Sequence, residues 1–560
     1  MQAFAVACVF ALLFHSLILI MHNNTFYALL LAACCATSAV AQQAPAKGKT
    51  KAKRGDVTTS PVQPTMTPAP APSAADLATA YASSITQEDL RKHLSIIASD
   101  EYEGRETGEK GQKMAAEYIA KQFKDLGLVG PVQGSDNPYV QHFTMVRSTW
   151  GNDATLAIGK QTYKWTTDFL GYGRTPFATE TTVQPVFVGY GLEADYAGKE
   201  LKGKDVIMLI SEPGMNEYRS KIATASSKGV RSIFLVNFTP GASFTATTAP
   251  IAAYVSRPTI MFKDAPQQSG GRAAAFIVTP AVGYKMLGTN EAGITKYLAA
   301  AKSGSQPAAS FKPASFRIKT PQNQQEFVTE NVMGLLEGTD KKDEYLVCSA
   351  HYDHVGVIKG EVYNGADDDG SGTVSVLEMA EAFAKAKKEG HGPRRSILFL
   401  TVTGEEKGLL GSEYYTDHPV LPLAQTIADL NTDMVGRTDK DHEGKGDYVY
   451  VIGSDKLSSE LHTIVQNENK QHTNIDLDFR FNDPQDPNRF YYRSDHYNFA
   501  KHKIPVAFFF NGVHADYHGA GDEVSKIEFP QMEKRVHLIF YTAWDLANRD
   551  TRIVVDSNKQ

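Results

Sequence analysis

The chain has 560 residues, of which 42% are hydrophobic and 21% are charged, and its formal net charge is -6 at pH 7. This length exceeds what one hydrophobic core normally serves, so we expect about two or three domains. No clustered excess of Lys and Arg accompanies the acidic balance in the part predicted to fold. This excludes a general nucleic-acid binder, because neutralising phosphates requires such a cluster.

The amino-terminal region has the composition of an export signal. Two apolar stretches precede the first charged residue, Lys47, and the second ends in Ala39–Ala41, a small-x-small pattern typical of signal-peptide cleavage. We therefore predict residues 1–41 to be a signal peptide and the protein to be periplasmic or secreted. Two alternatives stay open: a retained membrane anchor, and a lipoprotein acylated at Cys34, because Leu31–Cys34 resembles a bacterial lipoprotein box.

Residues 42–75 are rich in proline and contain a basic run from Lys47 to Arg54, with few large apolar side chains. This composition predicts a disordered linker. Three of the four cysteines lie within residues 1–41, so we expect no disulfide in the mature domain. The fourth, Cys348, lies in an apolar run and is predicted to be a buried structural thiol.

The next segment is predicted to be helical. Leu90, Leu94 and Ile97 recur at helical spacing, and so do Ala115 and Phe123 further along, which predicts two helices between residues 76 and 128. From residue 151 to 322 the pattern changes to short β-rich runs with many Thr, Gly and Ala residues. This stretch is predicted to be a separate small domain.

Strands and helices alternate after residue 325. The predicted strands are 345–350, 397–402, 448–452 and 506–510, and the predicted helices are 372–387, 456–468 and 529–548. The alternation predicts an α/β fold with a mixed, mostly parallel sheet sandwiched by helices. In such sheets the ligand site lies outside the carboxyl ends of the strands.

Side chains that bind metals follow several of these strands. His351 ends the first, and Asp353 lies two residues on, where it could accept a proton from the ring nitrogen that does not bind metal. Three consecutive carboxylates, Asp367–Asp369, need a cation or water to balance their charge. The middle one, Asp368, could bridge two ions.

Four further groups complete the set: Glu405, Glu406, Asp433 and His518. Of the two adjacent glutamates, one could bind metal while the other takes a proton from water. Nitrogen and carboxylate ligands together suit zinc. Two zinc ions that share a ligand could bind a nucleophile and the oxygen of the group that it attacks.

With Glu103–Gly108, Asn331–Gly334 and Arg493–His496, these residues resemble the co-catalytic di-zinc exopeptidases of the bacterial leucyl aminopeptidase and glutamate carboxypeptidase group, clan MH. The similarity covers about residues 85–150 and 325–550. It implies a catalytic domain formed by residues 76–150 and 323–552. The inserted residues 151–322 resemble a protease-associated domain.

The resemblance implies an aminopeptidase that acts on peptides with two zinc ions per chain. It places His351 and Asp433 on one zinc, Glu406 and His518 on the other, and Asp368 between them, with Glu405 as general base, Asp353 as the residue that orients the histidine, and Tyr491 as the phenol that stabilises the oxyanion.

The same residue types suggest four alternatives. A glutamate-carboxypeptidase-like enzyme would hold a substrate carboxylate with Arg489, Arg493 or Lys526, and a glutaminyl cyclase would use one zinc. A non-enzymatic, receptor-like binding module predicts missing ligands, and none is missing. A calcium-binding module is disfavoured because calcium sites rarely use histidine.

Overall fold

The computed structural model describes residues 73–172, 175–210, 215–238, 244, 248–249, 252, 258–264, 273–302 and 311–557. The predicted signal peptide and nearly all of the predicted linker lie outside these residues. Within them, no helix combines the length and the apolar composition that crossing a bilayer requires.

Three helices open the described chain: α1 (Ala74–Ala82), α2 (Gln87–Ile97) and α3 (Lys110–Asp125). The Ser73 hydroxyl caps α1 and the Thr86 hydroxyl caps α2, so each satisfies a backbone N–H that the first helical turn leaves without a partner. Helix α1 begins inside the segment that the sequence predicted as linker. The apolar residues that predicted α2 are buried, which confirms the helical periodicity there.

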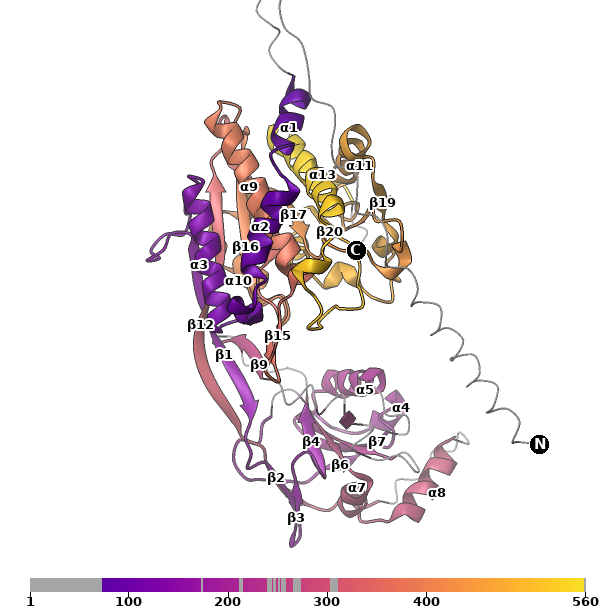
Figure 1. The fold of residues 1–560 in the computed structure, drawn as a ribbon. Coiled ribbons are helices and arrows are strands. Elements are labelled where there is room, and N and C mark those ends of the chain that lie inside the picture. Colours follow the sequence, from indigo (N-terminus) through magenta and orange to yellow (C-terminus); the bar gives the residue numbers. More distant parts are fainter. Residues whose placement is uncertain are drawn as a thin grey trace, which may run out of the picture. The chain divides into compact units, whose positions relative to one another are not determined.

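A nine-stranded mixed sheet forms the centre of the structure (Figure 1). Its spatial order is β19 (Asp476–Asp478), β18 (Tyr448–Ile452), β20 (Val506–Phe510), β17 (Thr426–Thr432), β13 (Lys341–His351), β16 (Arg395–Val402), β12 (Gln322–Leu336), β1 (Val140–Trp150) and β9 (Thr259–Phe262). The four strands from β20 to β16 are mutually parallel, whereas β12, β1 and β9 add as antiparallel neighbours. The predicted α/β class with a mixed sheet is therefore confirmed.

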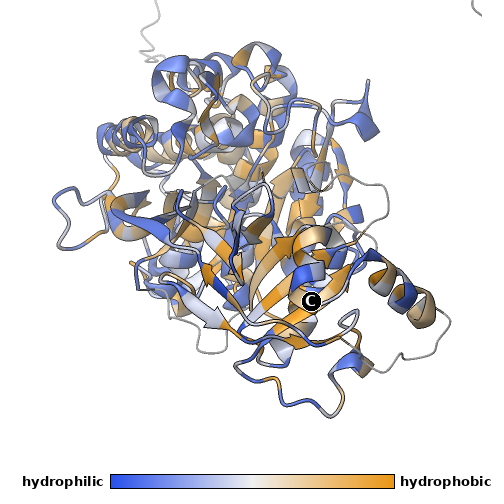
Figure 2. Cartoon of the chain, turned by 90° about the horizontal axis from the view of Figure 1, so that it is seen from below, coloured by the Kyte–Doolittle hydropathy of each residue, from blue (hydrophilic) through white to orange (hydrophobic). Residues whose placement is uncertain are grey.

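Helices cover both faces of this sheet. On one face α9 (Gly372–Lys388) and α13 (Phe529–Asn548) pack with α1, α2, α3 and α11 (Ser459–Glu468); on the other lie α10 (Leu410–Asp417) and α12 (His496–Lys501). Each face of the sheet has its own hydrophobic core. Alternate residues of β13 are buried in these two cores, with Leu346 and Cys348 in one and Val347 in the other. The hydropathy view shows hydrophobic residues gathered in the strands (Figure 2). Cys348 is a buried free thiol, as predicted, and burial raises its pKa.

Between β1 and β12 the chain builds two smaller sheets. One has the order β4 (Phe169–Tyr172), β10 (Ala274–Val278), β8 (Ser232–Asn237), β7 (Asp205–Ile210) and β6 (Val186–Phe187), and the other has the order β3 (Gln161–Lys164), β2 (Thr155–Ile158), β11 (Phe316–Lys319) and β5 (Thr181–Val183). The helices of this segment are α4 (Glu193–Tyr196), α5 (Met215–Ser227), α7 (Pro280–Leu287) and α8 (Glu291–Lys302).

One strand of this segment belongs to the large sheet. Strand β9 pairs with β1, and Phe262 lies against Phe143 and Tyr414. The stretch 151–322 thus contributes to two cores of its own and to the edge of the central sheet. Its assignment as a protease-associated domain and the predicted domain boundaries stay predictions.

Phe383 on α9 provides a test of the main core. Its fully buried ring lies 4.7 Å from that of Phe540 and 5.5 Å from that of Trp544, between centroids. We expect Phe383→Ala to lower the free energy of unfolding by about 3–5 kcal/mol, because it leaves a cavity that the helices cannot fill. Val328→Ala, at a side chain that is 49% exposed, should change it by less than about 0.5 kcal/mol. Urea unfolding followed by circular dichroism measures both, and equal midpoints would contradict this account of the core.

Candidate metal centre

The predicted ligands converge at the carboxyl edge of the central parallel strands. His351 is the last residue of β13 and pairs with Val402, the last residue of β16, so Glu405 and Glu406 emerge beside it. Asp433 directly follows β17, the neighbour of β13 on its other side. The turn Ala366–Ser371, which carries Asp368, leads into α9 at the same edge.

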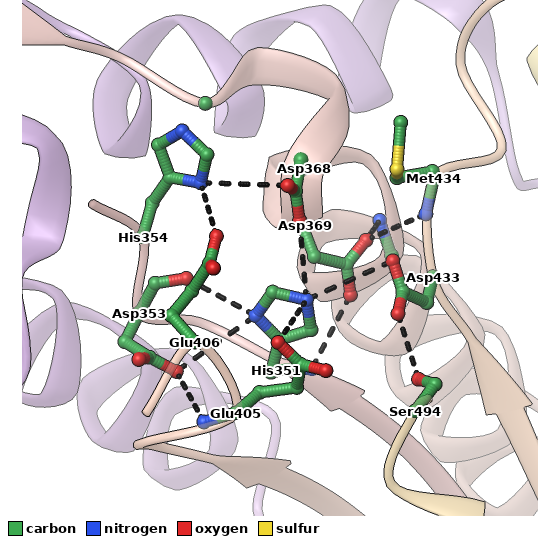
Figure 3. Close-up of polar contacts among 12 residues, drawn as sticks. His351, Asp353, His354, Asp368, Asp369, Glu405, Glu406, Asp433, Met434 and Ser494 are labelled. Atoms are coloured by element: carbon green, nitrogen blue, oxygen red, sulfur yellow. Dashed lines mark hydrogen bonds and ion pairs between the residues drawn. The ribbon is translucent and has the colours of Figure 1, made fainter. Parts of the chain in front are cut away.

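Asp368 lies between two groups of ligand atoms (Figure 3). Its Oδ1 atom is 3.3 Å from His351 Nε2, which lies 3.7 Å from Asp433 Oδ1. Its Oδ2 atom is 3.1 Å from His518 Nε2, which in turn is 3.0 Å from Glu406 Oε2. The structure therefore brings all five residues predicted as metal ligands together, with one carboxylate shared by both groups.

His354 belongs to the second group, although the sequence predicted only a supporting or structural role for it. Its Nδ1 atom is 2.9 Å from Glu406 Oε1 and 3.8 Å from Asp368 Oδ2. The ring is fully buried, and its Nε2 atom has no hydrogen-bond partner among the described residues. Two histidines, His354 and His518, thus face the same pair of carboxylates. The position of His354 three residues after His351 was the signal available in the sequence.

The charge balance of this edge fits divalent cations. His351 Nε2 is buried without a hydrogen-bond partner among the described residues, and buried carboxylates carry a large free-energy cost unless positive charge compensates them. Nitrogen and carboxylate donors in two groups that share Asp368 form a suitable donor set for a pair of zinc ions.

Glu405 and Glu406 are adjacent in the chain but titrate in opposite directions. Burial raises the pKa of Glu405 well above its usual value, and the charges of Glu406 and Asp433 raise it further against the opposing effect of His351. Burial also acts on Glu406, but hydrogen bonds from His354 and His518 outweigh it, and the pKa of Glu406 falls to about 2. Glu406 is thus the anion that pairs with cations, and Glu405 the carboxyl group that binds a proton readily.

Asp353 connects His351 with Glu405. Its Oδ2 atom accepts a hydrogen bond from Thr107 Oγ1 at 2.7 Å, and its Oδ1 atom accepts one from the backbone N–H of Glu405 at 3.2 Å. Its Oδ1 atom lies 3.8 Å from His351 Nδ1, and its backbone oxygen is closer, at 3.1 Å. The residue predicted to orient the histidine therefore contacts that ring and also fixes the backbone of Glu405.

The carboxylates beside Asp368 are held by backbone amides. Asp369 accepts hydrogen bonds from the N–H groups of His351, Gly372 and Met434, which belong to β13, α9 and the segment after β17. Asp522 in turn accepts hydrogen bonds from the N–H groups of Asp367 and Asp368. These bonds fix the turn and leave the side chain of Asp368 directed at the ligand groups.

A hydroxyl supports Asp433 from outside the cluster. Ser494 donates to Asp433 Oδ2 at 2.7 Å, and its own oxygen accepts a hydrogen bond from the side-chain amide of Asn431 at 2.9 Å. Hydrogen bonds of this kind orient the residues that bind a metal.

Arg105 anchors the loops around the site. Its guanidinium is fully buried and donates hydrogen bonds to the backbone oxygens of Ile97, Tyr352, Asn364 and Gly365. It thereby links the end of α2 to two points of the loop that leads from β13 to Asp368. The sequence analysis used Arg105 as part of a motif without assigning it a role.

Tyr517 adjoins the ligand cluster through His518. Burial raises the pKa of Tyr517, and the charges of Asp368, Glu406 and Glu405 raise it further. Its ring stacks on that of His518 at 4.0 Å between centroids.

The predicted residue, Tyr491, contacts other aromatic rings instead. Its neighbours include Tyr492, Tyr497 and His496, and the pKa of its phenol is raised by burial and by the two tyrosines, with a contribution from Asp455. None of these groups is a carboxylate of the metal site. The two tyrosines thus have different electrostatic surroundings.

Comparison with known proteins agrees with this geometry. The model of peptidase family M28 matches residues 331–543. The aminopeptidase YwaD of Bacillus subtilis is 25% identical over 335 residues, which cover 59% of this chain and 58% of that protein. An Arabidopsis thaliana protein named "Probable glutamate carboxypeptidase LAMP1" is 34% identical over 105 residues, which cover 19% of this chain and 14% of that protein. The matched regions thus span less than two thirds of either relative.

A solved structure has the same fold. The aminopeptidase from Aneurinibacillus sp. strain AM-1 aligns with a TM-score of 0.52 at 19% sequence identity, and the alignment covers 86% of this chain and 100% of that one.

Proposed function

Because residues 331–543 belong to peptidase family M28, we propose that this chain is a zinc-dependent aminopeptidase that removes amino-terminal residues from peptides. The observation that carries the proposal is the position of Asp368 between two sets of histidine and carboxylate ligands, with Glu405 at their border. The relative named as an aminopeptidase supports the choice of substrate.

The ligand groups assign the metal-binding roles. His351 and Asp433 would hold one zinc ion, Glu406 and His518 the other, and Asp368 would contribute one oxygen to each. His354 faces the second position and is available there as a further ligand. When bound, zinc polarises a carbonyl oxygen and lowers the pKa of a water molecule to about 7.

Glu405 would move the proton. Its Oε2 atom is 3.9 Å from His351 Nε2, so it borders the cluster without taking a place beside Asp368. As general base it takes a proton from the water that attacks the scissile carbonyl, and it then gives that proton to the nitrogen of the departing amine. Nearby cations lower the pKa of such a base, and burial raises the pKa of Glu405, so the two effects oppose each other.

We assign the stabilisation of the tetrahedral oxyanion to Tyr517 in place of Tyr491. A phenol adjacent to the ligand cluster can donate a hydrogen bond to an oxygen on which charge develops. Tyr517 is influenced by three of the cluster's carboxylates, whereas Tyr491 is enclosed by Tyr492, Tyr497 and His496.

One observation favours a glutamate-carboxypeptidase-like activity as the second candidate. Arg493 lies close enough to Tyr517 to oppose the rise in the pKa of its phenol, and it could hold a substrate carboxylate. Lys526 is another side chain that could hold a substrate carboxylate, but its Nζ atom is already paired with Asp516 Oδ1 at 2.9 Å. The similarity to the Arabidopsis protein agrees with this alternative.

Assays with matched peptides separate the two candidates. An aminopeptidase hydrolyses peptides with a free amino end and ignores amino-blocked ones. Hydrolysis of blocked peptides with a free carboxyl end, without hydrolysis of free-amine peptides whose carboxyl end is blocked, would overturn the aminopeptidase assignment and support the second candidate.

Glu405→Gln tests the base. The amide cannot accept the proton, so we expect kcat to fall by about 10²–10⁴-fold while the zinc content per chain stays unchanged. Steady-state kinetics and elemental analysis on the same sample measure both. Wild-type turnover in this variant would remove Glu405 from the role.

A pair of phenylalanine substitutions tests the assignment of the tyrosines. Tyr517→Phe removes the hydrogen-bond donor, so we expect kcat to fall by about 10²–10³-fold with little change in KM. Tyr491→Phe is the matched control and should keep kcat within a few fold. The opposite pattern in the two variants would restore the original prediction for Tyr491.

We propose that the protein is exported with cleavage after Ala41, because the Ala39–Ala41 pattern ends an apolar stretch. Amino-terminal sequencing of the protein from its native host should then begin at Gln42. A first residue of Cys34 would support the lipoprotein alternative, and an intact amino-terminal region would support a retained anchor.

A further inference from the structure

A second cluster of metal-binding side chains lies where α2 packs against α9. It consists of His93 on α2 and of Glu378 and Glu381 on α9, and one potential ligand atom from each residue lies within 4.8 Å of the others. The two glutamates are three residues apart in a helix, so they point to the same side. Glu378 lies six residues beyond Gly372, about 9 Å along the helix axis, so the cluster is separate from the turn that carries Asp368.

The buried part of this cluster contains an acceptor that is not satisfied. Glu378 is 1% exposed, and its Oε1 atom has no hydrogen-bond partner among the described residues. His93 Nε2 lies 3.4 Å from this atom, and His93 is 5% exposed. A buried carboxylate in this state costs free energy unless a cation or a proton compensates it.

The His93 ring is oriented as a metal ligand would be. Its Nδ1 atom lies 2.6 Å from the hydroxyl of Tyr118 on α3, and the two rings meet edge to face. With Nδ1 held by this hydroxyl, Nε2 points toward Glu378. Histidines that bind metals typically have their second ring nitrogen fixed by a hydrogen bond of this kind.

Solvent can reach the cluster from one side. Glu381 is exposed, whereas Glu378 and His93 are buried, so an ion could enter past Glu381 and keep water as a further ligand. The surrounding charges are mixed: Asp89 and Lys92 both act on Glu378. With two glutamates and a histidine facing one point, the cluster itself has a negative excess.

We propose that His93, Glu378 and Glu381 bind a structural divalent metal ion of the zinc type, distinct from the ions at Asp368. Histidine nitrogen with two carboxylates is a donor set that zinc accepts, and water completes the coordination. The ion would connect helix α2 to helix α9, which begins directly after the turn that carries Asp368. Its role is to stabilise the fold, so it stands whether or not the proposed peptidase activity is correct.

Zinc binding to the full-length protein and its variants tests the proposal. The protein is stripped with a chelator and titrated with Zn²⁺, and bound zinc per chain is measured by elemental analysis after dialysis. We expect Glu381→Gln to bind one zinc ion fewer than wild type, or to bind that ion at least about 10-fold more weakly. Peptide hydrolysis by the zinc-loaded variant should stay at the wild-type level. Glu88→Gln, an exposed change on helix α2, which carries His93, is the matched control and should keep the wild-type stoichiometry.

Two further variants make the result decisive. Glu378→Gln should lose the same ion, and the exposed position of Glu381 keeps the test available if the buried Glu378 variant does not fold. Asp368→Ala should lose the ions at Asp368 and retain the ion at His93. Failure of the proposed structural site is therefore distinguishable from failure of the proposed function. Equal zinc content and equal affinities in wild type, Glu381→Gln and Glu378→Gln would overturn the proposal and leave a protonated Glu378 beside His93 as the explanation.

Discussion

The site depends on the electrostatic compensation of carboxylates crowded at one edge of a parallel sheet. Asp368, Asp369, Glu405 and Asp433 are brought together because the strands that precede them end side by side. Such a group of buried or nearly buried acids would oppose folding if left without partners. The structure distributes the charge among backbone amides, histidines and the Ser494 hydroxyl.

The scaffold around the acids is built from ordinary hydrogen bonds. Asp369 joins three elements through their N–H groups, and Arg105 joins the loops above them through their carbonyl oxygens. Neither side chain needs to contact substrate to influence the geometry of the site. By fixing the backbone, these bonds leave the side chain of Asp368 directed at both ligand groups.

Much of the structure after residue 325 could be predicted from sequence, because buried strands and the metal-binding residues that follow them have local sequence patterns. The strand 448–452 and the helix 529–548 were predicted with their observed bounds, whereas β17 was missed, since the polar Asp429, Asn431 and Thr432 interrupt its apolar pattern. The different surroundings of Tyr491 and Tyr517 depend on packing that no spacing in the sequence reveals. Strand β9 could not be foreseen either, because its partner β1 lies more than a hundred residues earlier in the chain.

Anomalous X-ray diffraction at the zinc absorption edge, on crystals of the zinc-loaded protein, tests the shared carboxylate most directly. If Asp368 serves both ligand groups, two peaks should lie about 3.5–4 Å apart, one on the side of His351 and one on the side of His518. A single peak at this edge of the sheet, or two peaks too far apart to share one carboxylate, would contradict the account.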